Sequence, residues 1–283
     1  MKAFLRAILA ASALMAGIPT LAADDGGTIY GSGRDSFSLA TGSPGELGLL
    51  KTLAEAFARQ ADARMVWIKA GTGQSLNLLR DKKVDMVMVH APAQVDKAIA
   101  DGWAAKKTLI GSNEFYLVGP AADPAGIAKA GGASEAYRKI AAAGSPFVSR
   151  GDNSGTHQKE MQIWKTAGVE PQGAWYIVTK DFMTASLKRA NAEGAYFMSD
   201  SSTWIMEKGV SPNLTILLRG DRVLVNTYHA IVAPPGATAG RDTAERFIAF
   251  VASPEGQRII ADFGRERFGE GLYNDASYAR QFD

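Results

Sequence analysis

The stretch from residue 146 to residue 160 brings together the residue types that bind anions. Backbone N–H groups at a helix start carry the positive end of the helix dipole, and a guanidinium donates charge-assisted hydrogen bonds. An apolar segment, a polar turn and a helical segment follow one another here, as expected for a strand that feeds a helix. The groups that could contact an anion come from Ser149, Arg150, Ser154, Gly155 and Thr156.

Two earlier stretches have the same order of strand, small polar turn and helix. Their turns cover residues 42–46 and 71–75, and both are rich in glycine and hydroxyl side chains. A buried dianion needs donors on several sides, because an uncompensated charge is costly away from water. We therefore expect the three turns to converge on one cleft. The candidate contacts from the first two turns are Thr41, Gly42, Ser43, Thr72 and Gly73.

Each of these residues also has a purely structural interpretation. Ser43 and Thr72 could be plain helix caps, and the hydroxyls of the third turn could simply form the turn. Arg150 could make a surface salt bridge with Asp152. A metal site is not expected, because none of the histidines has a second ligand at metal-binding spacing. The histidines are His90, His157 and His229.

Composition indicates an exported globular protein. The chain has 283 residues, is 46% hydrophobic and 21% charged, and contains no cysteine, so disulfides and a lipid-modified cysteine are excluded. Residues 1–23 have the basic start, apolar run and small residues of a cleavable signal peptide. Removing its Lys2 and Arg6 leaves 29 basic residues, 31 less 2, against 29 acidic ones. The mature protein is predicted to be soluble and periplasmic, without membrane insertion and without affinity for nucleic acid.

Two series of alternating strands and helices predict an α/β fold with two lobes. In each series the alternation implies parallel pairing with helices on the sheet faces. The predicted divisions are lobe I over residues 24–115, lobe II over 116–226, and a return to lobe I over 227–283, with two crossover strands between the lobes. The predicted strands cover residues 37–41, 64–70, 84–90, 114–119, 147–149, 175–178, 195–198, 214–218 and 225–232. The predicted helices cover residues 43–60, 75–80, 134–143, 155–167, 184–191, 202–208, 241–252 and 254–263.

Several motifs together resemble the tungstate-binding proteins of bacterial ABC importers, the Tup type. They lie at residues 71–74, 89–92, 118–120, 123–127, 147–157, 175–176 and 253–257. The resemblance implies a type II periplasmic binding protein that binds an oxyanion, tungstate or molybdate, without a cofactor. It also implies partners, an ABC permease and ATPase at the inner membrane, and a monomeric receptor.

Three turns depart from the family pattern and keep the identity of the anion open. The threonine-rich first turn is replaced by Thr41-Gly42-Ser43-Pro44, a Gly-Met-Gly turn by Asp181-Phe182-Met183, and a Thr-Asp-Arg-Gly turn by Ser199-Asp200-Ser201-Ser202. A different small anion, such as an organic acid, a sulfonate or a phosphate-like ion, is therefore an alternative ligand.

Two other functions compete with transport. A receptor that reports to a signalling system would have the same sequence features. A hydrolase would use Ser154 or Ser149 with His157 as base, but the chain has no Gly-x-Ser-x-Gly elbow and no evident third member of a triad. We therefore predict a binding protein and not an enzyme.

Overall fold

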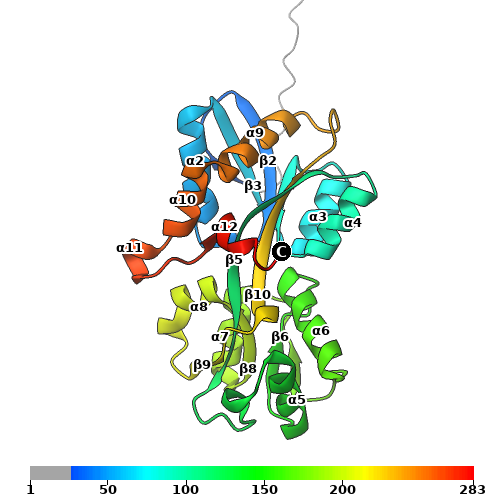
Figure 1. Ribbon diagram of the computed structural model, residues 1–283, viewed down its shortest axis with the longest axis vertical. Helices are drawn as coiled ribbons and strands as arrows, with labels where there is room; N and C mark the ends of the chain where they lie inside the picture. Colours follow the sequence, from blue (N-terminus) through cyan, green and yellow to red (C-terminus); the bar gives the residue numbers. More distant parts are fainter. Residues whose placement is uncertain (1–26) are drawn as a thin grey trace, which may run out of the picture.

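The computed structural model describes residues 27–283, and the predicted signal peptide lies outside them. The described chain forms two lobes that share two strands, β5 (Ala105–Pro120) and β10 (Val225–Val232), as Figure 1 shows. The first part of β5, up to Glu114, pairs with β10, whereas the part from Phe115 onward pairs with lobe II strands. This arrangement confirms the predicted two-lobed α/β fold with two crossover strands.

Lobe I contains a six-stranded part of the sheet in the order β1, β3, β2, β4, β10, β5. The central strand β2 is parallel to both β3 and β4, as predicted from the intervening helices, while β1 and β10 join antiparallel. The strands not yet placed are β1 (Thr28–Tyr30), β2 (Asp35–Thr41), β3 (Ala63–Lys69) and β4 (Met86–Val89).

Helices cover both faces of the lobe I sheet because its strands carry apolar side chains on both sides. Leu39 faces one core with Phe37 and Met65, whereas its neighbour Ala40 faces another core with Val87. The first core is covered by α2 (Leu49–Gln60), α9 (Arg241–Ala252) and α10 (Pro254–Asp262). The second is covered by α3 (Thr72–Arg80) and α4 (Pro92–Ala100) (Figure 1).

Lobe II has the strand order β9, β5, β8, β6, β7, and β6 is parallel to both of its neighbours. Trp164, Tyr137 and Phe147 are fully buried at its centre. Its strands are β6 (Phe147–Ser149), β7 (Tyr176–Val178), β8 (Tyr196–Asp200) and β9 (Leu214–Leu218). Its helices are α5 (Ala133–Ala143), α6 (Gly155–Ala167), α7 (Met183–Glu193) and α8 (Ser201–Glu207).

Short elements complete the chain. The last of them, β11 (Asn274–Asp275) and α12 (Ala276–Ala279), lie against the crossover strand β5. The others are α1 (Ser43–Glu46), η1 (Ile127–Lys129), η2 (Lys208–Val210), η3 (Arg222–Leu224) and α11 (Arg265–Phe268). Within residues 27–283, no helix has the length and apolar character needed to cross a bilayer.

The first predicted helix is wrong in two respects. It is divided into α1 and α2 by Gly48, whose φ of 94° suits glycine and interrupts the helix. The cap is Gly42, whose carbonyl accepts from the backbone N–H groups of Gly45 and Glu46, so Ser43 is the first helical residue and not the helix cap. The helix α4 and the first half of β5 were not predicted at all.

Candidate anion-binding site

The third turn, residues 150–154, leads from β6 into α6 with its backbone fixed by short-range contacts. Asn153 has a positive φ of 57°, which asparagine tolerates better than most residues. The carboxylate of Asp152 accepts from the backbone N–H of Ser154 at 3.1 Å. Ser154 is the N-cap of α6, and its hydroxyl accepts from the backbone N–H of His157 at 3.3 Å. The turn is therefore preformed at the positive end of a long helix.

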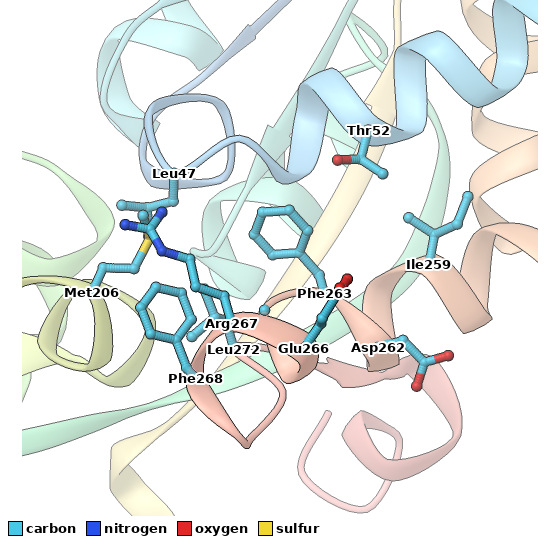
Figure 2. Close-up of a pocket in the computed structure, with 11 residues that line it drawn as sticks. Leu47, Thr52, Met206, Ile259, Asp262, Phe263, Glu266, Arg267, Phe268 and Leu272 are labelled. Carbon is cyan, nitrogen blue, oxygen red and sulfur yellow. The ribbon is translucent and has the colours of Figure 1, made fainter.

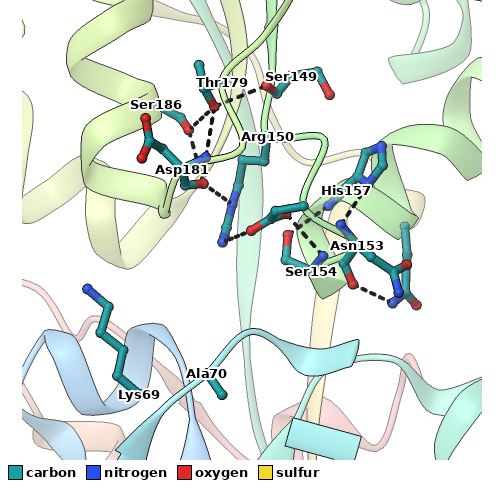
Figure 3. A network of polar contacts seen from close by, with 12 residues as sticks. Lys69, Ala70, Ser149, Arg150, Asn153, Ser154, His157, Thr179, Asp181 and Ser186 are labelled. Atoms are coloured by element: carbon teal, nitrogen blue, oxygen red, sulfur yellow. Dashed lines mark hydrogen bonds and ion pairs between the residues drawn. The ribbon is translucent and has the colours of Figure 1, made fainter. Parts of the chain in front are cut away.

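Arg150 is buried in this turn rather than on the surface. Its side chain is only 4% exposed, and its guanidinium donates to the Asp152 carboxylate at 2.6 Å and to the Asp181 carbonyl at 3.1 Å (Figure 3). The ion pair considered in the sequence interpretation exists, but its burial makes it part of a fixed site. The arginine is held in one orientation next to the start of α6.

The second and third turns meet between the lobes, and glycine permits their close approach. A Cβ atom at Gly73 would lie 2.8 Å from Asn153 Nδ2, and one at Gly71 would lie 3.5 Å from Ser154 Cβ. Further along the same boundary, Gln94 of α4 donates to Gln158 of α6 at 2.6 Å. The starts of α3 and α6 are thus brought together.

The first turn lies beside the second because β2 and β3 are paired neighbours, with Thr41 opposite Lys69. A Cβ atom at Gly42 would lie 3.4 Å from the Ala70 carbonyl oxygen. The hydroxyl of Thr41, however, donates to the Met88 carbonyl at 2.8 Å inside the sheet. Thr41 thus helps to join β2 to β4.

Several donors around these turns remain available for a ligand. Within the described part of the chain, the hydroxyls of Ser43, Thr72 and Thr156 have no protein hydrogen-bond partner. The start of α3 also lacks a side-chain cap, so its first N–H groups are not satisfied by a neighbouring side chain. Hydroxyls, helix N–H groups and a buried guanidinium together suit a small anion.

Ser149 takes part in a buried polar cluster behind Arg150. Its hydroxyl lies 2.9 Å from that of Tyr176, which donates to the carboxyl of Glu160 at 2.6 Å. The indole of Trp164 also donates to this carboxyl at 3.2 Å. Burial raises the pKa of Glu160 to about 7, even though these hydrogen bonds act in the opposite direction. Ser149 therefore has a partner within lobe II, and its contact with a ligand stays a prediction.

His90, at the end of β4, contacts lobe II. A Cβ atom at Gly155 would lie 2.4 Å from the His90 ring, so the ring rests on the first residue of α6. Its Nδ1 lies 2.8 Å from the Asn226 side-chain oxygen, and Asn226 donates to Asn113 at 2.8 Å. Burial lowers the pKa of His90 to about 4, so the ring is neutral at neutral pH. The crossover strands β5 and β10 thus position a lobe I residue against the candidate site.

Lys69 was not predicted as a site residue. It ends β3, and its Nζ lies 4.1 Å from the centre of the Phe182 ring in lobe II. Figure 3 shows its side chain directed from lobe I toward the turn that carries Asp181. The Arg150 guanidinium carbon is 5.6 Å from the centre of the same ring. A second cation therefore lies at the boundary where the turns meet. Its position depends on strand pairing and on the contact between the lobes, which the sequence pattern does not reveal.

A separate pocket of about 420 Å³ begins at Leu47, just after the first turn, and extends along residues 259–272 (Figure 2). Apolar side chains such as Leu47, Met206 and Phe263 line it, together with two carboxylates and one guanidinium, from Asp262, Glu266 and Arg267. An excess of carboxylates is unfavourable for an anion. Among residues 27–283 no cluster of three or more His, Asp or Glu side chains suitable for a metal ion is found.

The chain is similar to known proteins in sequence and in fold. A sequence model of the PBP superfamily domain matches residues 26–255. The tungstate-binding protein TupA of Peptoclostridium acidaminophilum is 31% identical over 245 residues, which cover 85% of each chain.

Two solved structures are also similar. One, described as the tungstate ABC transporter from Geobacter sulfurreducens, is 38% identical with a TM-score of 0.74 and covers 82% of this chain and 100% of its own. The other, the tungstate-binding protein TupA from Desulfovibrio alaskensis G20, is 36% identical with a TM-score of 0.70. The match covers 85% of this chain and 98% of the TupA chain.

The chain belongs to the periplasmic binding protein superfamily. Within it, the chain is a binding protein of the Tup type with the type II fold, which confirms the resemblance drawn from its motifs.

Proposed function

We propose that this protein is the substrate-binding component of an ABC importer, and that it binds a small oxyanion, tungstate or molybdate, between its lobes. The observation that carries the proposal is the meeting of the α3 and α6 starts next to the buried Arg150 guanidinium. Such a site replaces the water around a dianion with backbone N–H groups, hydroxyls and one arginine. The names of the similar proteins support the same ligand class.

The ligand contacts are proposed residue by residue. We assign direct contact to the free hydroxyls of Ser43, Thr72 and Thr156, to Arg150, and to the backbone at Gly42, Gly73 and Gly155. Ser149 and Thr41 act from behind these groups, since their hydroxyls have protein partners. Ser154 caps α6 and fixes the direction of its N–H groups.

The cellular setting follows from the same proposal. The mature chain acts as a monomer in the periplasm after removal of residues 1–23, and delivers its ligand to a permease and ATPase at the inner membrane. It uses no cofactor. We also propose that lobe II is inserted into lobe I, between residues 115 and 227. Hydrolysis is disfavoured as an activity, because Ser154 Oγ accepts from a backbone N–H and His157 Nδ1 accepts from Asn153 instead of pairing with a serine.

Thermal unfolding of the mature protein against a panel of anions tests the proposal. A ligand at a thousand times its dissociation constant stabilises by roughly 4 kcal/mol, which raises the midpoint by about 8–16 °C for a chain of this length. We expect this shift with tungstate and molybdate, and not with sulfate, phosphate, small carboxylates or sulfonates. A shift with an organic anion alone would show that the altered turns have changed the specificity, and no shift with any anion would contradict the proposed function.

A further inference from the structure

The aromatic ring of Phe182 lies close to one cation from each lobe. It precedes α7 of lobe II and is its N-cap. Lys69 Nζ from lobe I lies 4.1 Å from the ring centre, and the Arg150 guanidinium carbon from lobe II lies 5.6 Å from it. Both distances fall within the range in which an aromatic ring attracts a cation. The ring therefore links a charge of lobe I to the lobe that holds the buried arginine.

Lys69 is held by an ion pair while its side chain remains partly exposed. Its ammonium group contacts Glu46 Oε1 at 2.6 Å, and its side chain is 45% exposed. Glu46 is the last residue of α1, which lies within the first turn of the site. The ion pair alone is partly screened by solvent and contributes little. Its effect is to direct a long, flexible side chain toward lobe II, where the Phe182 ring provides the second contact.

We propose, on the basis of the proposed function, that Lys69 and Phe182 form a latch that closes the lobes over the bound anion and adds a second cation to the site. The contact forms only when the lobes meet, because Lys69 and Phe182 lie in different lobes that are joined by β5 and β10. Lobe closure therefore brings the Lys69 charge to the ligand, and opening withdraws it. Phe182 stands where the Gly-Met-Gly turn of the resembled family has methionine, so the aromatic ring of the latch is particular to this chain's turn.

The test is a double-mutant cycle on tungstate affinity, measured by calorimetry. Lys69→Met keeps the length of the side chain and removes the charge, and Phe182→Leu keeps apolar bulk and removes the ring. Each single variant is expected to weaken binding by about two- to fivefold, and the double variant by little more than either one. Lys69→Arg should bind like the wild type. Equal binding by wild type and Lys69→Met, or fully additive losses, would overturn the latch.

A matched control separates the latch from a general charge effect. Lys51 pairs with Glu55 on the surface of lobe I, with a side chain 58% exposed, and Lys51→Met should leave affinity unchanged. Because Lys69 is partly exposed, the loss in Lys69→Met should shrink as salt concentration rises. A loss that is independent of salt would contradict the contribution of its charge.

A measurement without ligand distinguishes failure of the latch from failure of the proposed function. The sequence contains no cysteine, so spin labels can be placed uniquely at Lys83→Cys in lobe I and Lys165→Cys in lobe II. Both residues are exposed. We expect the distance distribution between the labels to broaden toward longer distances in Lys69→Met. An unchanged distribution would overturn the latch whether or not the protein binds any anion.

Discussion

Replacing Arg150 by alanine is expected to remove most of the anion affinity. The guanidinium is almost completely buried and makes hydrogen bonds with Asp152 and Asp181, so its place is fixed before the ligand arrives. Truncation removes the main positive charge and leaves the Asp152 carboxylate without its partner beside the anion. Truncating one member of a buried charge pair at an interface costs about 2–5 kcal/mol, which corresponds to about a 30-fold to several-thousand-fold loss of affinity.

The free protein should remain folded, although it becomes less stable. Asp152 keeps 18% of its side-chain surface exposed and can be hydrated after the substitution, so the stability lost is that of a charged hydrogen bond, about 1.5–3 kcal/mol. For a chain of this length we expect a midpoint lower by about 3–12 °C.

Calorimetric titration with tungstate, paired with thermal unfolding of the free variant, gives both quantities. The variant Arg150→Met with Asp152→Asn serves as control, because it removes both charges and should recover stability without recovering affinity. Tungstate binding at wild-type strength in Arg150→Ala would refute the assignment of this arginine as the centre of the site.

The remaining predictions concern pH and lobe contact. Below pH 4.5 Glu160 is protonated in both states, but between about 4.5 and 7 only the unfolded chain releases the proton. The free energy of unfolding should thus fall by about 3 kcal/mol across this range. Denaturant unfolding at several pH values should show this fall in the wild type and not in Glu160→Gln. The same dependence of unfolding free energy on pH in both proteins would exclude Glu160 as its source. In Gly155→Ala the new methyl would overlap the His90 ring, which rests on Gly155. Overpacking of this kind costs about 1–3 kcal/mol, so tungstate affinity should fall by about five- to 150-fold in a calorimetric titration. Undiminished affinity would show that the lobes need not close this tightly.

The sequence was sufficient for the parts of the fold that local patterns control. The alternation of strands and helices predicted the parallel cores of both lobes, and the strand from residue 147 with its helix after Ser154 agrees with the structure. Gly48 escaped notice because a single left-handed residue leaves the apolar spacing on both sides unchanged. The first half of β5 was missed because its residues, from Ala105 to Asn113, lack a clear alternation of polar and apolar positions.

The candidate site was predictable only in its backbone plan. Glycines and hydroxyls at helix starts are local signals, and they marked all three turns. The roles of Lys69 and His90 depend on contacts between the two lobes. No local sequence pattern shows which residue of one lobe will contact the other. The carboxyl of Glu160 was overlooked for a similar reason, since its partner Tyr176 comes from a strand that follows the helix.

The two crossover strands also determine the order in which the chain can fold. Glu114 and Val225 are paired residues of β5 and β10, yet all of lobe II separates them along the chain. Bringing such distant residues together costs loop-closure entropy and slows folding. If lobe II folds first, it holds the ends of both strands side by side and removes most of that cost.

Lobe I must therefore wait for the chain that follows lobe II. Its central strand β2 needs β4, β4 needs β10, and the core on one face needs α9, which comes later still. A chain that crosses a membrane from its N-terminus presents the first part of lobe I without these partners. Until residue 232 has emerged, β4 lacks its partner β10 and presents an unpaired apolar edge that has to be kept from aggregating.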